Sequence, residues 1–145
     1  MTYLFMQSLL LSIFIACFAP KEDTKLTIEI SNIQKPKGTV RIGVFKANST
    51  FGSTYTKPDY GQMVAVRDTK SQWTVMNLPP GQYALALYHD LNDNVKLDRN
   101  FVGYPKEPYG FSNNYRPIFR GPSFRECAFE VREDGKTAIK IKLID

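Results

Sequence analysis

Hydrophobic and polar residues alternate along most of the chain after residue 24. Leu26, Ile28 and Ile30 are separated by polar residues, and Val40, Ile42 and Val44 repeat the same spacing. A period of two places alternate side chains on opposite faces of a β-strand. Residues 83–88 are apolar on both faces, as in a central strand. The pattern predicts seven short strands, at residues 26–30, 39–45, 63–66, 73–76, 83–88, 127–131 and 138–143.

Turn-forming residues separate these runs. Pro36-Lys37-Gly38 follows the first predicted strand, and Pro79-Pro80-Gly81 precedes the central one. Asp134-Gly135 predicts a hairpin between the last two strands. Because the chain shows no helical face over three turns, we expect an all-β fold: a single antiparallel β-sandwich of about seven strands over residues 25–145, transthyretin-like or immunoglobulin-like.

The first twenty residues carry no charged side chain, and their apolar run at residues 9–16 is too short for a transmembrane helix. This segment resembles a secretory signal peptide. Ile15-Ala16-Cys17 also resembles the end of a bacterial lipoprotein signal, in which Cys17 would be lipidated. We therefore expect an exported protein with a signal peptide or lipoprotein signal at residues 1–20. A periplasmic, an outer-membrane-anchored and a secreted form remain open.

Composition narrows the chemistry. The 145 residues are 43% hydrophobic and 23% charged, and they include one His and two Cys. One domain is expected, without a multi-histidine metal centre or a four-cysteine zinc site. Cys127 lies in an alternating run, so we expect a buried, inert thiol. The net charge of +5 is dispersed. Arginines interleave with aromatics near residues 115–125, but we interpret them as solvated, and we expect no nucleic-acid partner.

Residues 90–124 break the regular alternation. This segment follows the central strand and is rich in Asn, Pro, Gly and aromatic residues. Long loops inside a compact domain are usually functional or closely packed when they are ordered. We expect one long ordered loop here, and we expect it to carry the function.

The loop begins like a calcium-binding loop. Oxygen-bearing side chains stand at relative positions one, three, five and nine, at Asp90, Asn92, Asn94 and Asp98. Calcium prefers several such oxygens on a tightly curled chain. Val95 replaces the glycine usual at position six, and Phe101 replaces the glutamate usual at position twelve. Calcium is the one cofactor that the sequence suggests; the alternative is an Asx-rich turn that caps backbone N–H groups.

The later part of the loop is aromatic. Four rings and two amides could form a stacking platform for a sugar or a peptide, with Asn side chains as polar contacts. The candidate ligand-binding residues are Tyr104, Tyr109, Phe111, Asn113, Asn114 and Tyr115. The alternative is a hydrophobic lid over the open end of the sandwich.

No catalytic residue is predicted. His89 and Asp90 point to opposite faces of a strand, and no nucleophile has a recognisable context. A hydrolase of envelope glycans is a weaker hypothesis, with a carboxylate pair drawn from Asp90, Asp98 and Glu107.

Several strings together resemble a bacterial exported family known as domain of unknown function 2141, over roughly residues 25–143. They are Leu78-Pro79-Pro80-Gly81-Gln82-Tyr83-Ala84, His89-Asp90 with Asn92 and Asn94, Gly103-Tyr104-Pro105-Lys106-Glu107, and Tyr109-Gly110-Phe111-Ser112-Asn113-Asn114. The family usually has Gly where this chain has Val95. The Pro-Pro-Gly element also resembles transthyretin-like and Cna-B-like sandwiches, many of which are stalks, accessory modules and binding units. The resemblance implies the fold and export, and it brings no activity with it.

We therefore expect a non-enzymatic binding or accessory module of the bacterial cell envelope that works through residues 90–124. Its partner would be an envelope ligand, a glycan or a protein, with membrane contact only through an N-terminal lipid anchor. The alternatives are a calcium-binding structural domain and, less favoured, a glycan-acting hydrolase.

Overall fold

The computed structural model describes residues 24–47, 49–52 and 57–145. The predicted signal segment at residues 1–20 and its predicted lipidation site, Cys17, lie outside the described residues. Within the described ranges, no helix is both long and apolar enough to cross a membrane.

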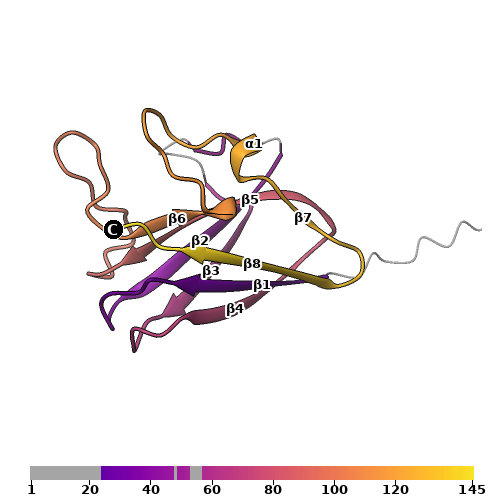
Figure 1. The fold of residues 1–145 in the computed structure, drawn as a ribbon, viewed down its shortest axis with the longest axis horizontal. Helices are drawn as coiled ribbons and strands as arrows, with labels where there is room; N and C mark the ends of the chain where they lie inside the picture. Colours follow the sequence, from indigo (N-terminus) through magenta and orange to yellow (C-terminus); the bar gives the residue numbers. More distant parts are fainter. Residues whose placement is uncertain (1–23, 48, 53–56) are drawn as a thin grey trace, which may run out of the picture.

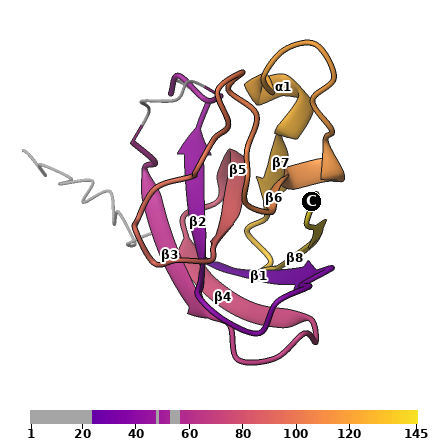
Figure 2. The same ribbon diagram turned by 90° about the vertical axis from the view of Figure 1, so that its left-hand side faces the viewer.

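The chain folds into two packed sheets (Figures 1 and 2). The smaller sheet has the strand order β4-β1-β8, and the larger has the order β3-β2-β5-β6, with β7 also paired to β5. The strands are β1 (Thr24–Ser31), β2 (Thr39–Lys46), β3 (Tyr60–Ala65), β4 (Gln72–Leu78), β5 (Gly81–Asp90), β6 (Tyr109–Phe111), β7 (Phe129–Val131) and β8 (Lys136–Lys142). Two short helical turns, η1 (Ser112–Asn114) and α1 (Phe124–Cys127), complete the fold. The predicted all-β sandwich is confirmed.

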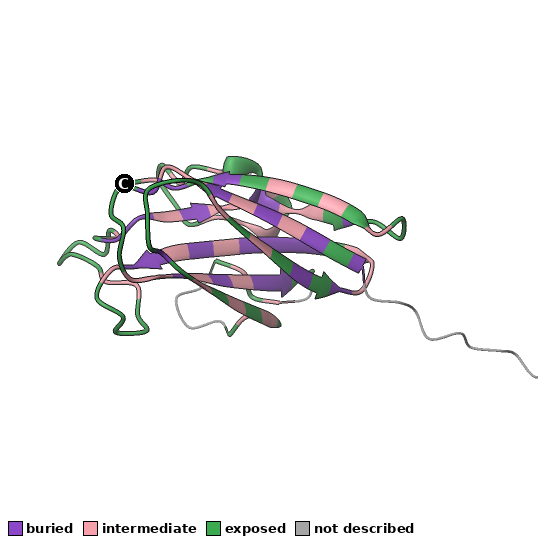
Figure 3. Cartoon of the chain, turned by 90° about the horizontal axis from the view of Figure 1, so that it is seen from below, coloured by how far each residue is buried: buried purple, intermediate pink, exposed green. Residues whose placement is uncertain are grey.

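The core lies between the sheets and follows the predicted alternation. Leu26, Ile28 and Ile30 on β1 are fully buried, and Val40 and Val44 on β2 face them from the other sheet. Figure 3 shows the resulting stripes of buried and exposed residues along each strand. Burying one such side chain contributes roughly 1.5–3 kcal/mol. All seven predicted strands are present, with ends displaced by a few residues.

Two details of the sequence-based picture are wrong. The predicted hairpin at residues 134–135 does not form, because β7 pairs with β5 whereas β8 pairs with β1 in the other sheet. The turn therefore carries the chain between layers. The β1–β8 pair is also parallel, with Ile28 opposite Ile139. Turn-forming residues indicate that the chain reverses but not which strand it then joins.

Cys127 ends α1 instead of lying in a strand, since β7 begins two residues later. Its thiol is fully buried, and burial raises its pKa to about 12. A thiolate is thus strongly disfavoured at neutral pH, as expected for an inert cysteine.

The 90–124 segment lies across the outer face of the larger sheet, where Figure 2 shows it passing in front of β2 and β3. It adds the three-residue strand β6, which the sequence did not predict. The sandwich thus carries a further layer on one side only.

Candidate functional site

A row of small residues crosses the outer face of the larger sheet and forms a floor without bulky side chains. Gly43 on β2 lies opposite Gly61 on β3 and Ala86 on β5. The next outward positions on β2 and β5 carry larger side chains, Arg41 and Tyr88, which lie opposite each other in register. The small residues leave space above the sheet. The loops on either side of this space are held in place by two groups of residues, one at each end of the row.

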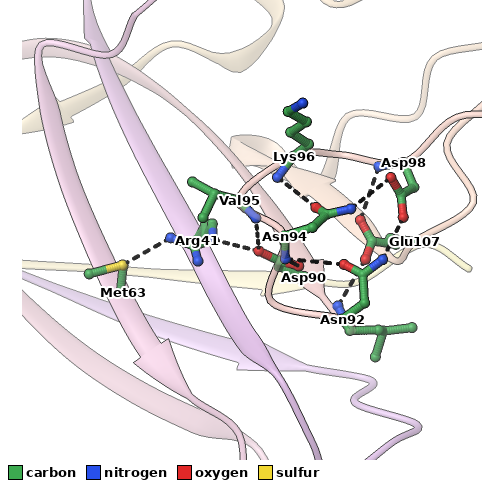
Figure 4. Close-up of polar contacts among 10 residues, drawn as sticks. Arg41, Met63, Asp90, Asn92, Asn94, Val95, Lys96, Asp98 and Glu107 are labelled. Carbon is green, nitrogen blue, oxygen red and sulfur yellow. Dashed lines mark hydrogen bonds and ion pairs between the residues drawn. The ribbon is translucent and has the colours of Figure 1, made fainter.

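The first anchor is the Asp90 turn, which we define as residues 90–98 together with Glu107. The Asp90 side chain is fully buried, and its Oδ2 accepts hydrogen bonds from Arg41 Nε at 2.7 Å and from the backbone N–H of Val95 at 2.9 Å (Figure 4). Its Oδ1 accepts the backbone N–H of Asn94 at 3.1 Å. Burial alone would raise the pKa of Asp90, but these hydrogen bonds outweigh it and the pKa is lowered.

Further hydrogen bonds within the Asp90 turn involve two asparagines and two acids. The side-chain amides of Asn92 and Asn94 donate to the Asp98 carboxylate at 2.8 and 3.0 Å. Buried Glu107 accepts the backbone N–H groups of Leu91 and Asp98, at 2.9 and 3.1 Å. The structure thus gathers the four predicted calcium ligands in one turn, with hydrogen bonds of the Asx-turn kind among them.

Two further facts bear on a metal at this turn. Val95 has a φ of 67°, the left-handed conformation that a glycine would adopt at the same position without strain. Within residues 24–47, 49–52 and 57–145, no group of three or more His, Cys, Asp or Glu side chains is arranged to hold a metal ion. The side-chain oxygens of the turn accept hydrogen bonds from N–H groups.

The second anchor is an aromatic cluster at the far end of the floor. The Phe51 ring packs edge-on against three other rings, with centroid distances of 5.1, 6.3 and 6.4 Å to Phe45, Phe111 and Phe124. Tyr109 and Tyr115 contact Phe111 from its other sides, at 5.8 and 6.5 Å. We define the aromatic cluster as Phe45, Phe51, Tyr109, Phe111, Tyr115 and Phe124.

The predicted stacking platform is therefore only partly assembled in one place. Tyr109, Phe111 and Tyr115 belong to the aromatic cluster, whereas Tyr104 is 60% exposed on the opposite loop. None of these four rings belongs to the core between the sheets. They cover the outer face of the larger sheet instead of the open end of the sandwich.

The two asparagines of the predicted platform bond to backbone. Asn113 Nδ2 donates to the carbonyls of Glu126 and Ala128, at 3.1 and 2.9 Å. Asn114 donates to the carbonyl of Lys140 at 3.1 Å and accepts the N–H of Lys142 at 2.7 Å. Both asparagines have positive φ, at 59° and 51°. Their amides tie the end of β6 to α1 and β8.

Between the two anchors lies a groove of about 1050 Å³, which we call the outer groove. Its floor includes Gly43, Ala86 and Tyr88, and its walls are the loops at 95–105 and 117–122. Four lining residues are cations: Arg41, Lys96, Arg99 and Arg120. None of the described lining residues is an Asp or Glu. The Asp90 turn and its partner Arg41 close one end of the groove.

The second wall has its own support. Arg120 forms two hydrogen bonds with Glu126, at 3.0 and 2.7 Å, and Glu126 also accepts the hydroxyl and N–H of Ser123. The Arg120 bonds, followed by those from Ser123, lower the pKa of Glu126 to about 2. Loop 117–122 is therefore held at its base by an ion pair.

One family model, described as an uncharacterized protein conserved in bacteria (DUF2141), matches residues 28–140. The chain belongs to the DUF2141 family. The matched range contains the Asp90 turn, the aromatic cluster and the outer groove, so these are parts of the DUF2141 domain itself. No curated protein and no solved structure matches the chain.

Sequence reasoning missed the sheet's contribution to this DUF2141 site. Arg41 and Tyr88 line the outer groove, yet Arg41 occupies an outward strand position that alternation assigns to solvent. Two signals were present: small residues at 43 and 86 on strands that neighbour each other, and a long insertion able to cover them. Alternation indicates which side chains face out but not which exposed face a later loop will cover.

Proposed function

We propose that this DUF2141 protein is an exported, non-enzymatic binding module of the bacterial cell envelope, and that its ligand occupies the outer groove. One observation carries the proposal: the groove combines an aromatic and apolar floor with cations in its walls. Ligand sites in proteins are typically concave and mostly apolar, with a few polar groups that orient the ligand.

The lining defines the ligand in chemical terms. Tyr88 and Tyr109 offer ring faces or edges to an apolar or ring-shaped group, and Arg99 and Lys96 offer positive charge. A volume of about 1050 Å³ is at the upper end of the range for small-molecule sites. A glycan fragment or a short peptide segment with a negatively charged group meets these requirements.

The state of the carboxylates supports a role without catalysis. A glycosidase needs one carboxylic acid and one carboxylate exposed on either side of the scissile bond. Asp90 and Glu107 are buried, and each accepts two backbone N–H groups. Asp98 accepts two side-chain amides. The three candidates hold the loop, and this use of their oxygens favours a binding function.

A calcium-binding turn is the second candidate. It is favoured by the gathering of Asp90, Asn92, Asn94 and Asp98 in one curl with a left-handed residue at position six. Arg41 weighs against it, because its guanidinium already supplies positive charge to the Asp90 oxygen. Calorimetric titration of the protein with CaCl₂ decides: heat and a raised melting temperature support this candidate, and their absence removes it.

The groove itself is tested with anilinonaphthalene sulfonate (ANS), whose rings and sulfonate match its lining. We expect saturable ANS fluorescence with the full chain, and loss of most of it in Ala86→Trp, which fills the groove floor. The matched control is Ala138→Trp, which places the same indole at an exposed position of β8. Equal ANS binding by the two variants, both folded by circular dichroism, would remove the outer groove as the site.

A further inference from the structure

Two loop tips carry large apolar side chains that are strongly exposed. Phe101 is 100% exposed and Phe119 is 99% exposed, and each has an exposed aliphatic neighbour, Val102 and Ile118. These loops stand at the top of Figures 1 and 2, and both contribute to the walls of the outer groove. Single exposed apolar residues are normal, but paired ones at two protruding tips at the same end of a molecule mark an interaction surface.

The two loops and the residues that flank them carry a net positive charge. Residues 95–126 contain six cations and three acids, a net charge of +3; the cations are Lys96, Arg99, Lys106, Arg116, Arg120 and Arg125. All three acids are bonded within the fold, as described above. Among the described residues, Lys96, Arg99, Lys106 and Arg116 form no ion pair, and Figure 4 shows Lys96 extending away from the Asp90 turn. The two loops thus combine exposed apolar tips with cations in the flanking residues.

Exposed apolar side chains beside cations fit the surface of an anionic lipid bilayer. A lipid bilayer presents anionic headgroups first and hydrocarbon beneath them, and amphipathic segments bind it through apolar insertion and basic residues. A protein partner would need a complementary hollow for each convex tip. We propose that the loops at 99–104 and 116–120 insert Phe101 and Phe119 into the surface of an anionic membrane. This contact goes beyond the proposed groove function and is separate from any N-terminal lipid anchor.

The chain's only tryptophan provides the probe and its control. Trp73 lies on β4, on the outer face of the other sheet, and is 58% exposed. Phe101→Trp in a Trp73→Phe background moves the sole indole to the loop tip. With vesicles of equal parts phosphatidylglycerol and phosphatidylcholine, we expect its emission to shift to the blue and to be quenched by brominated lipid. In the wild type, Trp73 should stay unquenched.

Charge reversal tests the electrostatic half of the proposal. Arg99→Glu with Lys106→Glu, introduced beside the loop indole, should raise the lipid concentration for half-maximal quenching at least about tenfold. The matched control, Lys136→Glu with Lys142→Glu on β8, should leave it unchanged. Vesicles of phosphatidylcholine alone should quench weakly.

Three results would overturn the proposal. The first is a loop indole that stays in water on anionic vesicles, as docking on a protein would give; the second is equal quenching at Trp73. The third is a half-maximal lipid concentration that Arg99→Glu with Lys106→Glu leaves unchanged. Failure here is distinguishable from failure of the groove proposal, since Phe101 is not among the described residues that line the outer groove. Phe101→Ser should therefore bind ANS as the wild type does.

Discussion

Within the 90–124 segment, the Asp90 turn and the loop tips are adjacent in the chain but use their side chains in opposite ways. In the Asp90 turn, the carboxylates of Asp90, Asp98 and Glu107 accept hydrogen bonds from neighbours, and those of Asp90 and Glu107 are buried. At the tips of the two loops that follow, Phe101 and Phe119 are almost fully exposed. Polar residues here hold the structure, while the apolar ones are free for a partner. Substitutions should therefore separate stability from binding along this segment.

The largest effect on stability is expected at Asp90. Asp90→Ala leaves the guanidinium of Arg41, whose side chain is 19% exposed, without its carboxylate, and it leaves two backbone N–H groups without an acceptor. Breaking a buried ion pair from one side costs about 3–5 kcal/mol, so we expect a loss of at least about 3 kcal/mol in urea unfolding. A loss below about 1 kcal/mol would contradict the assignment of Asp90 as the anchor.

The lowered pKa of Asp90 adds a pH dependence to the same experiment. A carboxyl with a depressed folded-state pKa contributes stability that is complete above its unfolded value of 3.8 and lost as pH falls through the folded value. Asp90→Asn removes this titration and should flatten the stability profile below about pH 4. A variant profile parallel to that of the wild type would show that the acid sensitivity has another source.

Glu107 should have the next largest effect. Glu107→Ala removes the acceptors of the Leu91 and Asp98 N–H groups in a buried position, which should cost about 2 kcal/mol in urea unfolding. Glu107→Gln keeps one oxygen acceptor and should lose about half as much. A Glu107→Gln variant as stable as the wild type would mean that packing, not hydrogen bonding, sets the contribution of Glu107.

Val95 should give a smaller effect of the opposite sign. A β-branched residue at a φ of 67° is strained, and its 63% exposed side chain has little packing to lose. Val95→Gly should raise the free energy of unfolding by about 0.5–1 kcal/mol, with Val95→Ala in between. Destabilisation by Val95→Gly would show that the side chain makes a contact worth more than the strain.

The smallest effect is expected at the tips. Phe101→Ser with Phe119→Ser should change the free energy of unfolding by no more than about 0.5 kcal/mol, since neither ring is buried. Phe45→Ser, in the aromatic cluster, provides the contrast: that ring is 8% exposed, and its loss should cost about 3 kcal/mol. If the tip variant unfolds as easily as Phe45→Ser, the tips are structural.

The strands and the Asp90 turn could be predicted because they depend on local patterns. Alternation at Leu26, Ile28 and Ile30 is enough to identify β1 and its buried face. The spacing of Asp90, Asn92 and Asn94 indicates a curled turn, although not whether N–H groups or a cation lies inside it. Strand β6 was missed because three residues are too few for a period to be recognised.

The remaining features depend on contacts between distant parts of the chain. Arg41 is separated from Asp90 by 49 positions, and nothing in its own strand indicates a buried partner. The exposure of Phe101 and Phe119 could not be predicted either, because aromatic residues in a loop are usually expected to pack. The outer groove needs β2, β5 and two loop walls at once. No single stretch of sequence contains that information.

The most direct test of the account is to map ANS onto the folded protein by the backbone amide NMR shifts of the full chain. We expect the largest shifts at Gly43, Ala86 and Tyr88, on the floor of the outer groove, and little change in β1, β4 and β8. Shifts centred on the outer face of the smaller sheet, or spread evenly over both sheets, would contradict the claim that the covered face of the larger sheet is the binding surface.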